Sequence, residues 1–390
     1  MESVTVMRAV RILFITVLLT VSATCSNDSE VSPPRVADGL LDLCDSVSVG
    51  LEYAPAECII LPSPEGYSNN VLLTGFKGEY YCMWQHSTRD EDSPDTHVLL
   101  STSADAHNWS DPEILLRGDE DFFTSPGGWI QRGDSLCAVI NRIRSGGRKG
   151  GEAWYVTSHG DGVWSTPRRL LMAGGEPLDG IFEQDPLVLP SGRTIGAAHF
   201  GETLDVCPLF TDDPSGLIGW RKALLPLGQG KPLEPSRYVS GDGSLVMLFR
   251  DQESSFRKLF SVSRDCGESW SAPMMTDIPD SRSKQCAGNL PDGRPFMVWN
   301  PSASKSRRHL AIAVSGDGLL FDRAWLIAGP RELPPQRREG RYKTIGYNYP
   351  KATVIDGVLW VSLSVNKEDV TLFRIAPEDL LRDYHTEKPI

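Results

Sequence analysis

The stretch Ser263-Arg264-Asp265-Cys266-Gly267-Glu268-Ser269-Trp270 has the pattern S-x-D-x-G-x-S-W, a short turn that ends on a tryptophan. An Asp in such a turn accepts hydrogen bonds from nearby backbone N–H groups, and a Gly takes up a positive φ without strain. The indole ring is then free to pack between neighbouring sheets. The stretch therefore predicts a β-hairpin turn whose tryptophan joins two sheets.

Looser copies of this turn recur along the chain at a nearly constant spacing. Trp109, Trp164, Trp220, Trp270 and Trp325 lie 55, 56, 50 and 55 residues apart. The stretches that lead to the other four tryptophans begin at Ser103, Ser158, Thr211 and Ser315. A period of about 50 residues is typical of arrays and propellers, in which each repeat is one unit of a larger core.

These turns resemble the Asp-box, or BNR, repeat of the sialidase (neuraminidase) superfamily, and the resemblance covers most of residues 45–377. It implies an all-β fold, a β-propeller of four-stranded blades. About 330 residues at roughly 54 per repeat predict six blades. The sixth would be closed by strands from both ends of the chain, near residues 58–60 and 370–373. A seventh blade follows only if the stretch 110–160 hides another repeat.

The rest of the chain agrees with a β fold. Short apolar runs separated by Gly, Pro and Asp turn signals follow one another, no long helical pattern interrupts them, and only residues 377–381 resemble a short helix. We expect four segments: a signal peptide (1–24), a polar tether (25–44), the propeller (45–377) and a C-terminal tail (378–390).

The first residues predict export. Arg8 and Arg11 precede an apolar run at 12–21 that is too short to span a bilayer, and small residues at 21–23 offer a cleavage site. Cys25 follows directly, as in a lipoprotein signal, and a lipid on it would attach the protein to a membrane. We expect a secreted or periplasmic protein, or a lipoprotein at the cell surface.

The composition of the chain limits the classes of ligand that it can bind. The formal net charge of −12 argues against nucleic acid, whose binding requires clustered Lys and Arg. An anionic substrate would therefore need a local arginine pocket. The cysteines lack C-x-x-C spacing, so we expect no zinc and no cofactor, while a structural calcium stays open. Cys44 and Cys58 could pair after export, or most cysteines could be buried thiols. Nothing indicates an oligomeric state.

The resemblance implies functional residues ahead of and beyond the best Asp-box copy. In sialidases a glutamate precedes a hairpin and an arginine follows about fifteen residues later; here Glu234 is followed by Arg250, sixteen residues on. Another arginine enters the penultimate blade, and Arg308 is favoured over Arg307 because it adjoins the expected strand. We therefore expect Glu234 to be catalytic and Arg250 and Arg308 to bind substrate.

The same resemblance implies a tyrosine nucleophile and an aspartic acid. Tyr349 lies seven residues before the Asp356-Gly357 turn and fits the start of a strand slightly better than Tyr347. The acidic loop after an early strand offers two candidates for the acid and two for substrate binding. The acid candidates are Asp92 and Asp95, and the binding candidates are Arg89 and His86.

The chemistry of an acidic sugar explains why these residue types would gather. Sialic acid carries a carboxylate on the carbon that is attacked, which would repel a carboxylate nucleophile, so a Tyr activated by a Glu serves instead. Arginines bind the substrate carboxylate through paired hydrogen bonds, and an Asp gives a proton to the leaving oxygen. The resemblance thus implies a secreted carbohydrate-active enzyme that hydrolyses terminal acidic sugars from glycans.

One part of the pattern is missing. The family opens with an Arg-Ile-Pro-type strand that supplies a first arginine, but no Arg lies between Arg35 and Arg89, and the matching region is 59–64. The family's set of three arginines is therefore either incomplete here or completed by Arg89, Arg142 or Arg144.

Two other functions stay open. One is a propeller polysaccharide lyase or rhamnosidase that acts on uronate-containing polysaccharide, with His86, His107 or His199 and Tyr347 moving protons; the other is a glycan-binding propeller without catalysis.

Overall fold

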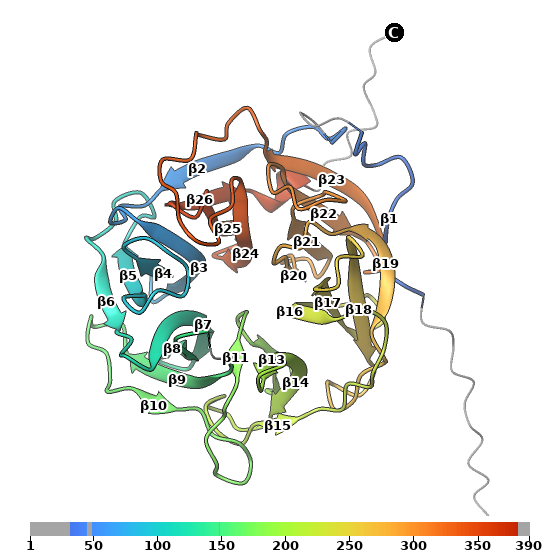
Figure 1. The fold of residues 1–390 in the computed structure, drawn as a ribbon. Coiled ribbons are helices and arrows are strands. Elements are labelled where there is room, and N and C mark those ends of the chain that lie inside the picture. Colours follow the sequence, from blue (N-terminus) through green and yellow to red (C-terminus); the bar gives the residue numbers. More distant parts are fainter. Residues whose placement is uncertain (1–31, 45–48, 148, 381–390) are drawn as a thin grey trace, which may run out of the picture. The chain divides into compact units, whose positions relative to one another are not determined.

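The computed structural model of the protein describes residues 32–44, 49–147 and 149–380. From Pro33 onward these residues belong to one compact unit. Its strands form six sheets that surround a central axis as the blades of a propeller (Figure 1). The expectation of an all-β propeller with six blades is therefore confirmed, and residues 110–160 hold parts of blades 1 and 2 instead of an extra blade.

The blades are numbered in chain order, and the strands of each blade are given from the axis outward. Blade 1 contains β3 (Tyr67–Phe76), β4 (Glu79–Ser87), β5 (His97–Ser103) and β6 (Glu113–Leu116). Blade 2 contains β7 (Phe122–Arg132), β8 (Ser135–Arg144), β9 (Gly151–Ser158) and β10 (Arg168–Arg169). Blade 3 contains β11 (Ile181–Phe182), β13 (Thr194–Phe200), β14 (Asp205–Thr211) and β15 (Arg221–Lys222), with β12 (Leu187–Val188) also paired to β13.

The other three blades follow in chain order. Blade 4 contains β16 (Pro232–Val239), β17 (Leu245–Asp251), β18 (Arg257–Ser263) and β19 (Met274–Pro279). Blade 5 contains β20 (Cys286–Asn289), β21 (Pro295–Trp299), β22 (Leu310–Ser315) and β23 (Leu320–Ala328). Blade 6 contains β24 (Tyr347–Ile355), β25 (Val358–Val365), β26 (Asp369–Ile375) and, from the other end of the chain, β2 (Ala56–Ile60).

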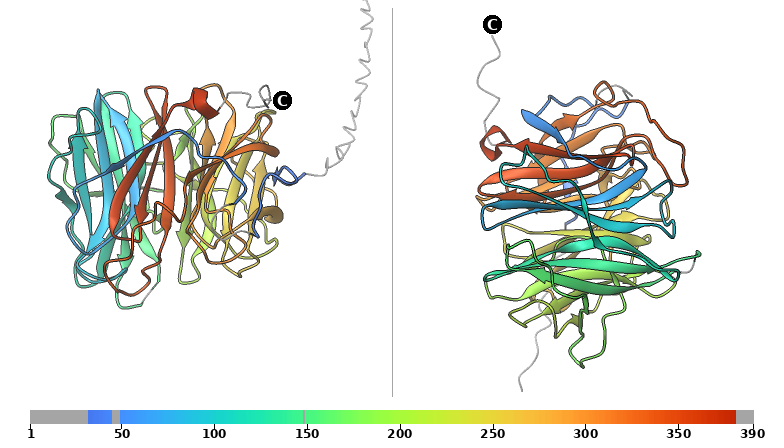
Figure 2. Two further views of the ribbon diagram at one scale, coloured as in Figure 1. Left: turned by 90° about the horizontal axis from the view of Figure 1, so that it is seen from above. Right: turned by 90° about the vertical axis from the view of Figure 1, so that its left-hand side faces the viewer.

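Blade 6 closes the ring with strands from both ends of the chain, as predicted. β2 pairs antiparallel with β26, and Cys58 lies opposite Phe373. A further N-terminal strand, β1 (Arg35–Val36), runs parallel to β23 on the outer edge of blade 5, and a single turn of 3-10 helix (Pro377–Leu380) follows β26. Seen from the side, the strands run from one face of the ring to the other (Figure 2).

The Asp-box turns join the third strand of a blade to the fourth. In blade 4, Asp265 Oδ1 accepts a hydrogen bond from Ser269 N (2.9 Å), and Trp270 Nε1 donates one to Gly267 O (3.3 Å). Trp270 is buried in the hydrophobic cluster that joins blades 3 and 4. In the four other turns the carboxylates of Asp105, Asp161, Asp213 and Asp317 likewise accept backbone N–H groups. Trp325 alone lies within a strand, β23, beyond its turn.

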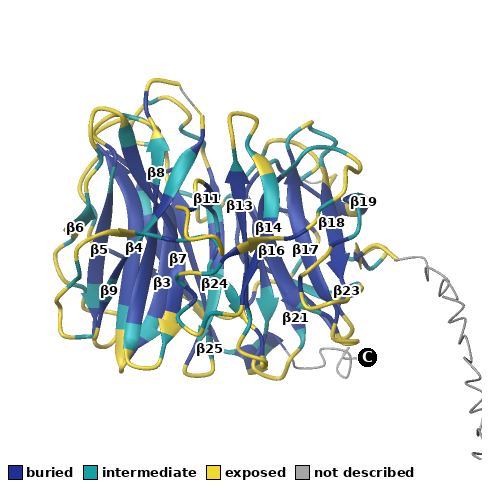
Figure 3. Ribbon diagram, turned by 90° about the horizontal axis from the view of Figure 1, so that it is seen from below, coloured by how far each residue is buried: buried dark blue, intermediate teal, exposed yellow. Residues whose placement is uncertain are grey.

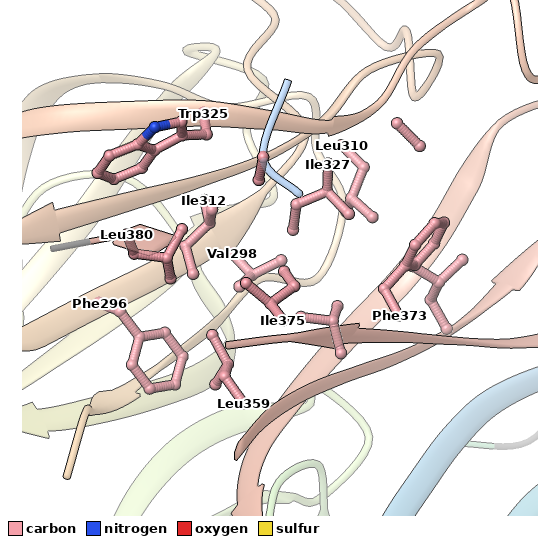
Figure 4. Packing of buried hydrophobic residues seen from close by; sticks show 14 of the residues in the cluster. Phe296, Val298, Leu310, Ile312, Trp325, Ile327, Leu359, Phe373, Ile375 and Leu380 are labelled. Atoms are coloured by element: carbon pink, nitrogen blue, oxygen red, sulfur yellow. The ribbon is translucent and has the colours of Figure 1, made fainter. Parts of the chain in front are cut away.

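The core of the protein lies between the blades. The strands are buried along most of their length, and the loops at both ends are exposed (Figure 3). Between blades 5 and 6, for example, Val298 and Ile312 pack in one cluster with Leu359 and Ile375 (Figure 4). Each such side chain contributes about 1.5–3 kcal/mol when it is removed from water. The interior is thus a series of apolar layers, which leaves the axis itself for polar groups.

Several predictions concern the ends of the chain and the cysteines. The segment predicted as a signal peptide, Cys25 and the residues beyond 380 lie outside the described residues. Cys44 and Cys58 are both exposed and free, so of the two alternatives left open the structure does not contain this pair. Among the described residues no helix is long and apolar enough to cross a membrane. The region 59–64 does not form the first inner strand, because β2 is the outermost strand of blade 6 and β3 occupies the inner position.

Candidate functional site

A cavity of about 760 Å³ lies where the inner strands meet. Side chains from β3, β16 and β24 line it, as do loops that join the second strand of a blade to the third. Because successive strands are antiparallel, these loops lie at the opposite ends of the strands from the Asp-box turns. One face of the ring is therefore built from the repeated turns, and the other surrounds the cavity.

Three side chains reach the cavity because the inner strands bulge. Asn70 on β3, Glu234 on β16 and Tyr349 on β24 have φ angles of 52°, 52° and 55°, and the strand register shifts at each of them. A positive φ costs a non-glycine residue about 1–3 kcal/mol, and bulges often re-aim side chains at functional sites. The same backbone device thus directs an amide, a carboxylate and a phenol toward the axis.

Glu234 and Arg250 form a buried ion pair across β16 and β17. Arg250 Nη1 lies 2.9 Å from Glu234 Oε2, and the two side chains are 10% and 7% exposed. Burial alone would raise the pKa of Glu234, but the charges of Arg250, Lys284 and Arg307 outweigh it and lower this pKa. Glu234 is therefore ionised and can accept a proton.

Tyr349 lies among cations. The nitrogen of Lys284 is 4.6 Å from its ring centroid and that of Lys367 is 5.2 Å away, and Arg250 hydrogen bonds to its hydroxyl. Burial, followed by the charges of Glu234 and Glu91, raises the pKa of Tyr349, so its hydroxyl keeps its proton at neutral pH. Within the described chain no hydrogen bond joins Glu234 to Tyr349 directly; Arg250 contacts both.

A backbone carbonyl holds two arginines side by side. Arg282 O accepts hydrogen bonds from Arg250 Nη1 (3.2 Å) and Arg307 Nη2 (3.1 Å). The loop that carries this carbonyl is anchored from beneath, because Asp280 accepts from Arg282 N and pairs with the buried Lys258 at 2.8 Å. Two guanidinium groups held in this way can bind a carboxylate between them.

Arg307, not Arg308, belongs to the site. Arg307 also donates to Asn348 Oδ1 (2.8 Å), and its guanidinium carbon lies 5.3 Å from the ring centroid of Tyr349. Arg308 is exposed and does not line the cavity. Adjacency to the next strand favours Arg308, but β22 begins only at Leu310, and Arg307 is the residue that contacts Asn348 and Tyr349.

Asp92 lies at the rim of the same cavity. It is on the loop between β4 and β5, and the protein atoms around its carboxyl, together with the charge of Glu91, raise its pKa to about 6. The loop is held in place because Lys367 pairs with Glu91 (2.6 Å) and Arg341 N donates to Asp90. A carboxyl with a pKa in this range can give up a proton near neutral pH.

Four other predicted residues lie away from the cavity. Asp95 stabilises its own loop: burial opposes its ionisation, but hydrogen bonds from Ser93 and Thr88 outweigh this and lower its pKa to about 2. Arg89 is exposed beside Asp90. His86 points to the opposite side of β4 from the cavity-lining Gln85 and contacts Ser68 and His97.

Tyr347 is the fourth, and it is buried between blades 5 and 6. Its hydroxyl donates to Gly329 O (2.9 Å). In a regular strand Tyr347 and Tyr349 would face the same side, but the bulge between them turns Tyr349 into the cavity and leaves Tyr347 in the core.

The site also contains residues that the sequence did not indicate. Lys284 donates to Asn70 Oδ1 (3.1 Å) and pairs with Glu183, while Lys367 lies on the loop between β25 and β26. The blade period could have pointed to Lys284, which comes just before β20. Of the arginines considered for the missing position, Arg142 pairs with Asp119 and Glu152, and Arg144 lies at the mouth of the cavity.

His199 lines the cavity, and both of its ring nitrogens are close to backbone groups. His199 Nε2 accepts from Glu234 N (3.3 Å), and its Nδ1 lies 3.1 Å from Leu204 O, so both ring nitrogens have backbone partners. Over the described ranges no group of three or more His, Cys, Asp and Glu side chains could hold a metal ion.

Comparisons with known proteins agree with this architecture. Residues 78–361 match the sequence profile of a family described as BNR repeat-like domain. No curated protein matches the sequence at a significant level. A protein of unknown function from Dyadobacter fermentans has a similar structure, with a TM-score of 0.60 and 15% identity over 82% of this chain and 98% of that one.

Solved sialidases have similar structures at low identity. The NanB sialidase from Streptococcus pneumoniae superposes with a TM-score of 0.60 and 14% identity, over 83% of this chain and 71% of that one. The Trypanosoma rangeli sialidase gives a TM-score of 0.60 and 13% identity, over 85% of this chain. This chain spans 59% of the trypanosomal enzyme's length. At such identities these likenesses concern the fold alone.

Proposed function

The chain belongs to the BNR repeat-like domain family, and on this premise we propose that it is a sialidase-like glycoside hydrolase that removes a terminal acidic sugar from glycans. One observation carries the proposal: Glu234, Tyr349 and Arg250 line one cavity with Asp92 at its rim, and Arg307 contacts Tyr349 and shares the Arg282 carbonyl with Arg250. A buried carboxylate beside a phenol that keeps its proton is the couple required when the substrate itself is negatively charged at the reacting carbon.

The proposed reaction assigns one task to each group. Arg250 and Arg307 bind the sugar carboxylate, which places the anomeric carbon next to the Tyr349 oxygen. As this oxygen forms a bond to that carbon, its proton passes to Glu234, while the bond to the leaving oxygen breaks and Asp92 protonates that oxygen. Water then attacks the anomeric carbon of the tyrosyl-linked sugar and gives its proton to Asp92. The bond from that carbon to the Tyr349 oxygen breaks, and Glu234 returns its proton to this oxygen, which restores the starting state of all three groups.

The two alternatives have unequal support. A lyase needs a histidine that is free to move a substrate proton, and His199, the histidine that lines the cavity, already has a backbone partner at each ring nitrogen. A glycan-binding role without turnover draws support from the missing first arginine, because the residue of β3 that lines the cavity is Asn70.

A substrate screen separates these functions. Purified protein should release free sialic acid from a sialoside. Ultraviolet absorbance from an unsaturated product on a uronate polysaccharide would indicate a lyase instead. Saturable glycan binding with no product from either substrate would indicate a binding protein, and absence of both binding and turnover would reject an acidic-sugar site altogether.

Asp92 should limit activity at high pH. A group that acts in its protonated form loses function as the pH rises through its pKa, so kcat/KM should fall about tenfold per unit above about pH 6. Asp92→Asn should abolish this fall of kcat/KM at high pH, the alkaline limb of the profile. It should slow the hydrolysis of substrates with a poor leaving group far more than that of substrates with an activated phenol. Asp95→Asn, on the same loop, is the matched control and should keep the limb at the same pH. A limb that survives in Asp92→Asn would assign the acid elsewhere.

A further inference from the structure

The mouth of the cavity carries three cations that have no carboxylate partner among the described residues. Arg144 and Lys149 lie on one side, at the end of β8 and on the loop that follows it, and Arg341 lies on the loop before β24. All three are exposed, and in the described part of the chain no carboxylate forms an ion pair with any of them. Three unpaired cations at one opening attract anions in a protein whose net charge is −12.

Two of these residues lead from the cavity to a second hollow. A groove of about 650 Å³ shares Arg144, Gly147, Lys149 and Gly150 with the cavity. Three carboxylates also line this groove: Glu152 pairs with Arg142 and Arg169, Asp179 pairs with Arg169, and Glu202 is exposed. Gly147 has a φ of 77°, and a side chain added there would meet no atom within 4 Å. The loop therefore leaves open space beside the cations, enough for a second sugar next to the one in the cavity.

The third cation lies beside the expected proton donor. Arg341 O accepts from Glu91 N (3.5 Å), so its loop is bound to the loop that carries Asp92. Arg341 also donates to the hydroxyl of Tyr342 (2.9 Å) and lies 4.7 Å from the centre of its ring. Tyr342 is 54% exposed, which presents an aromatic face at the rim for a sugar ring.

The position of Asp92 tells which part of a substrate would meet these groups. A general acid must lie at the leaving oxygen, so the sugar that departs extends past Asp92 toward the rim. The loop with Lys149 is the counterpart in blade 2 of the Asp92 loop in blade 1. The loop with Lys149 and the loop with Arg341 both neighbour the Asp92 loop. Their cations therefore face the part of the glycan that departs with the leaving oxygen, and not the terminal sugar that is bound in the cavity.

We propose that Arg144, Lys149 and Arg341 form a subsite for a carboxylate or sulfate on the leaving sugar, so that the preferred substrates are glycans with negative charges on adjacent residues. This subsite rests on the proposed hydrolase function, because it assigns the leaving-group side from Asp92. It concerns only the group that departs and is separate from Arg250 and Arg307, the arginines proposed to bind the carboxylate of the sugar that is removed.

Three substrates with the same terminal sugar test the subsite. These are unsulfated sialyl-lactose, sialyl-lactose sulfated on its galactose, and a disialoside whose leaving sugar carries a carboxylate. At low salt kcat/KM should be roughly three- to tenfold higher for one or both charged substrates than for the neutral one, the size expected for exposed ion pairs. About 0.5 M salt should remove the advantage, because it screens exposed charges. The two charged substrates distinguish carboxylate from sulfate recognition.

Substitutions locate the effect. In the double variant Lys149→Gln/Arg341→Gln the ratio of charged to neutral kcat/KM should fall toward one, whereas Arg264→Gln, on the Asp-box turn at the other face, should keep the wild-type ratio. Melting temperatures check that each variant is folded. Equal kcat/KM on all three substrates, or a ratio unchanged in the double variant, overturns the subsite and leaves the hydrolase intact. If wild type cleaves none of the three, the hydrolase function fails and the subsite fails with it.

Discussion

Replacing Glu234 by Gln should lower kcat by about 10²- to 10⁴-fold while the protein stays folded and still binds substrate. Tyr349 needs a base because burial and nearby carboxylates raise the pKa of its hydroxyl, and Gln cannot accept the proton. The amide oxygen still faces Arg250, so the free energy of unfolding should fall by less than the roughly 3–5 kcal/mol of a fully broken buried pair. Steady-state kinetics, glycan binding and thermal unfolding measure the three quantities.

Two controls test whether this result comes from Glu234 acting as the base for Tyr349. Glu253→Gln changes an exposed glutamate of the same blade and should leave kcat unaltered. A fluorinated sugar analogue should label Tyr349, visible by mass spectrometry; Tyr349→Phe should abolish the label, and Tyr347→Phe should retain it because Tyr347 lies in the core. Wild-type turnover in Glu234→Gln, or a label on another residue, would refute the couple.

Arg250→Lys should lower kcat/KM by roughly 10²-fold on an acidic sugar, the loss expected for a hydrogen bond between charged groups. An ammonium group cannot reach Glu234, Arg282 O and the substrate at once, as the planar guanidinium does. Much of the loss should appear in KM, since the carboxylate is bound before and during reaction.

Arg308→Lys provides the comparison for this experiment, because Arg308 is exposed and does not line the cavity. It should behave as wild type. If Arg250→Lys retains full kcat/KM on the acidic sugar, the two-arginine binding of the carboxylate is refuted.

The fold could be predicted because its signal is local and repeated. In each Asp-box turn the Asp bonds to backbone groups within a few residues, so the pattern survives in a single sequence even where the tryptophan drifts, as Trp325 does. The pairing of β2 with β26 followed from counting: five turns left one blade to be completed by the ends. Neither inference required knowledge of contacts across the ring.

The site was only partly predictable, because its geometry depends on bulges and on distant loops. Spacing indicated Glu234 and Arg250, which lie on adjacent strands, but could not separate Tyr349 from Tyr347, since a one-residue bulge decides which one turns inward. Lys284 and Lys367 come from different blades and meet Tyr349 only in the folded ring. No local pattern marks such a convergence.

The pairing of the two ends in blade 6 also sets an order of events during translation. β2 leaves the ribosome early, yet its partner β26 ends at Ile375 and is made after every other strand. Blades 1 to 5 can form while the chain grows, but β2 waits with an unpaired edge until synthesis is nearly complete. A message truncated before codon 369 would therefore yield a protein with open edges on both β2 and β25, the kind of surface on which nascent chains aggregate.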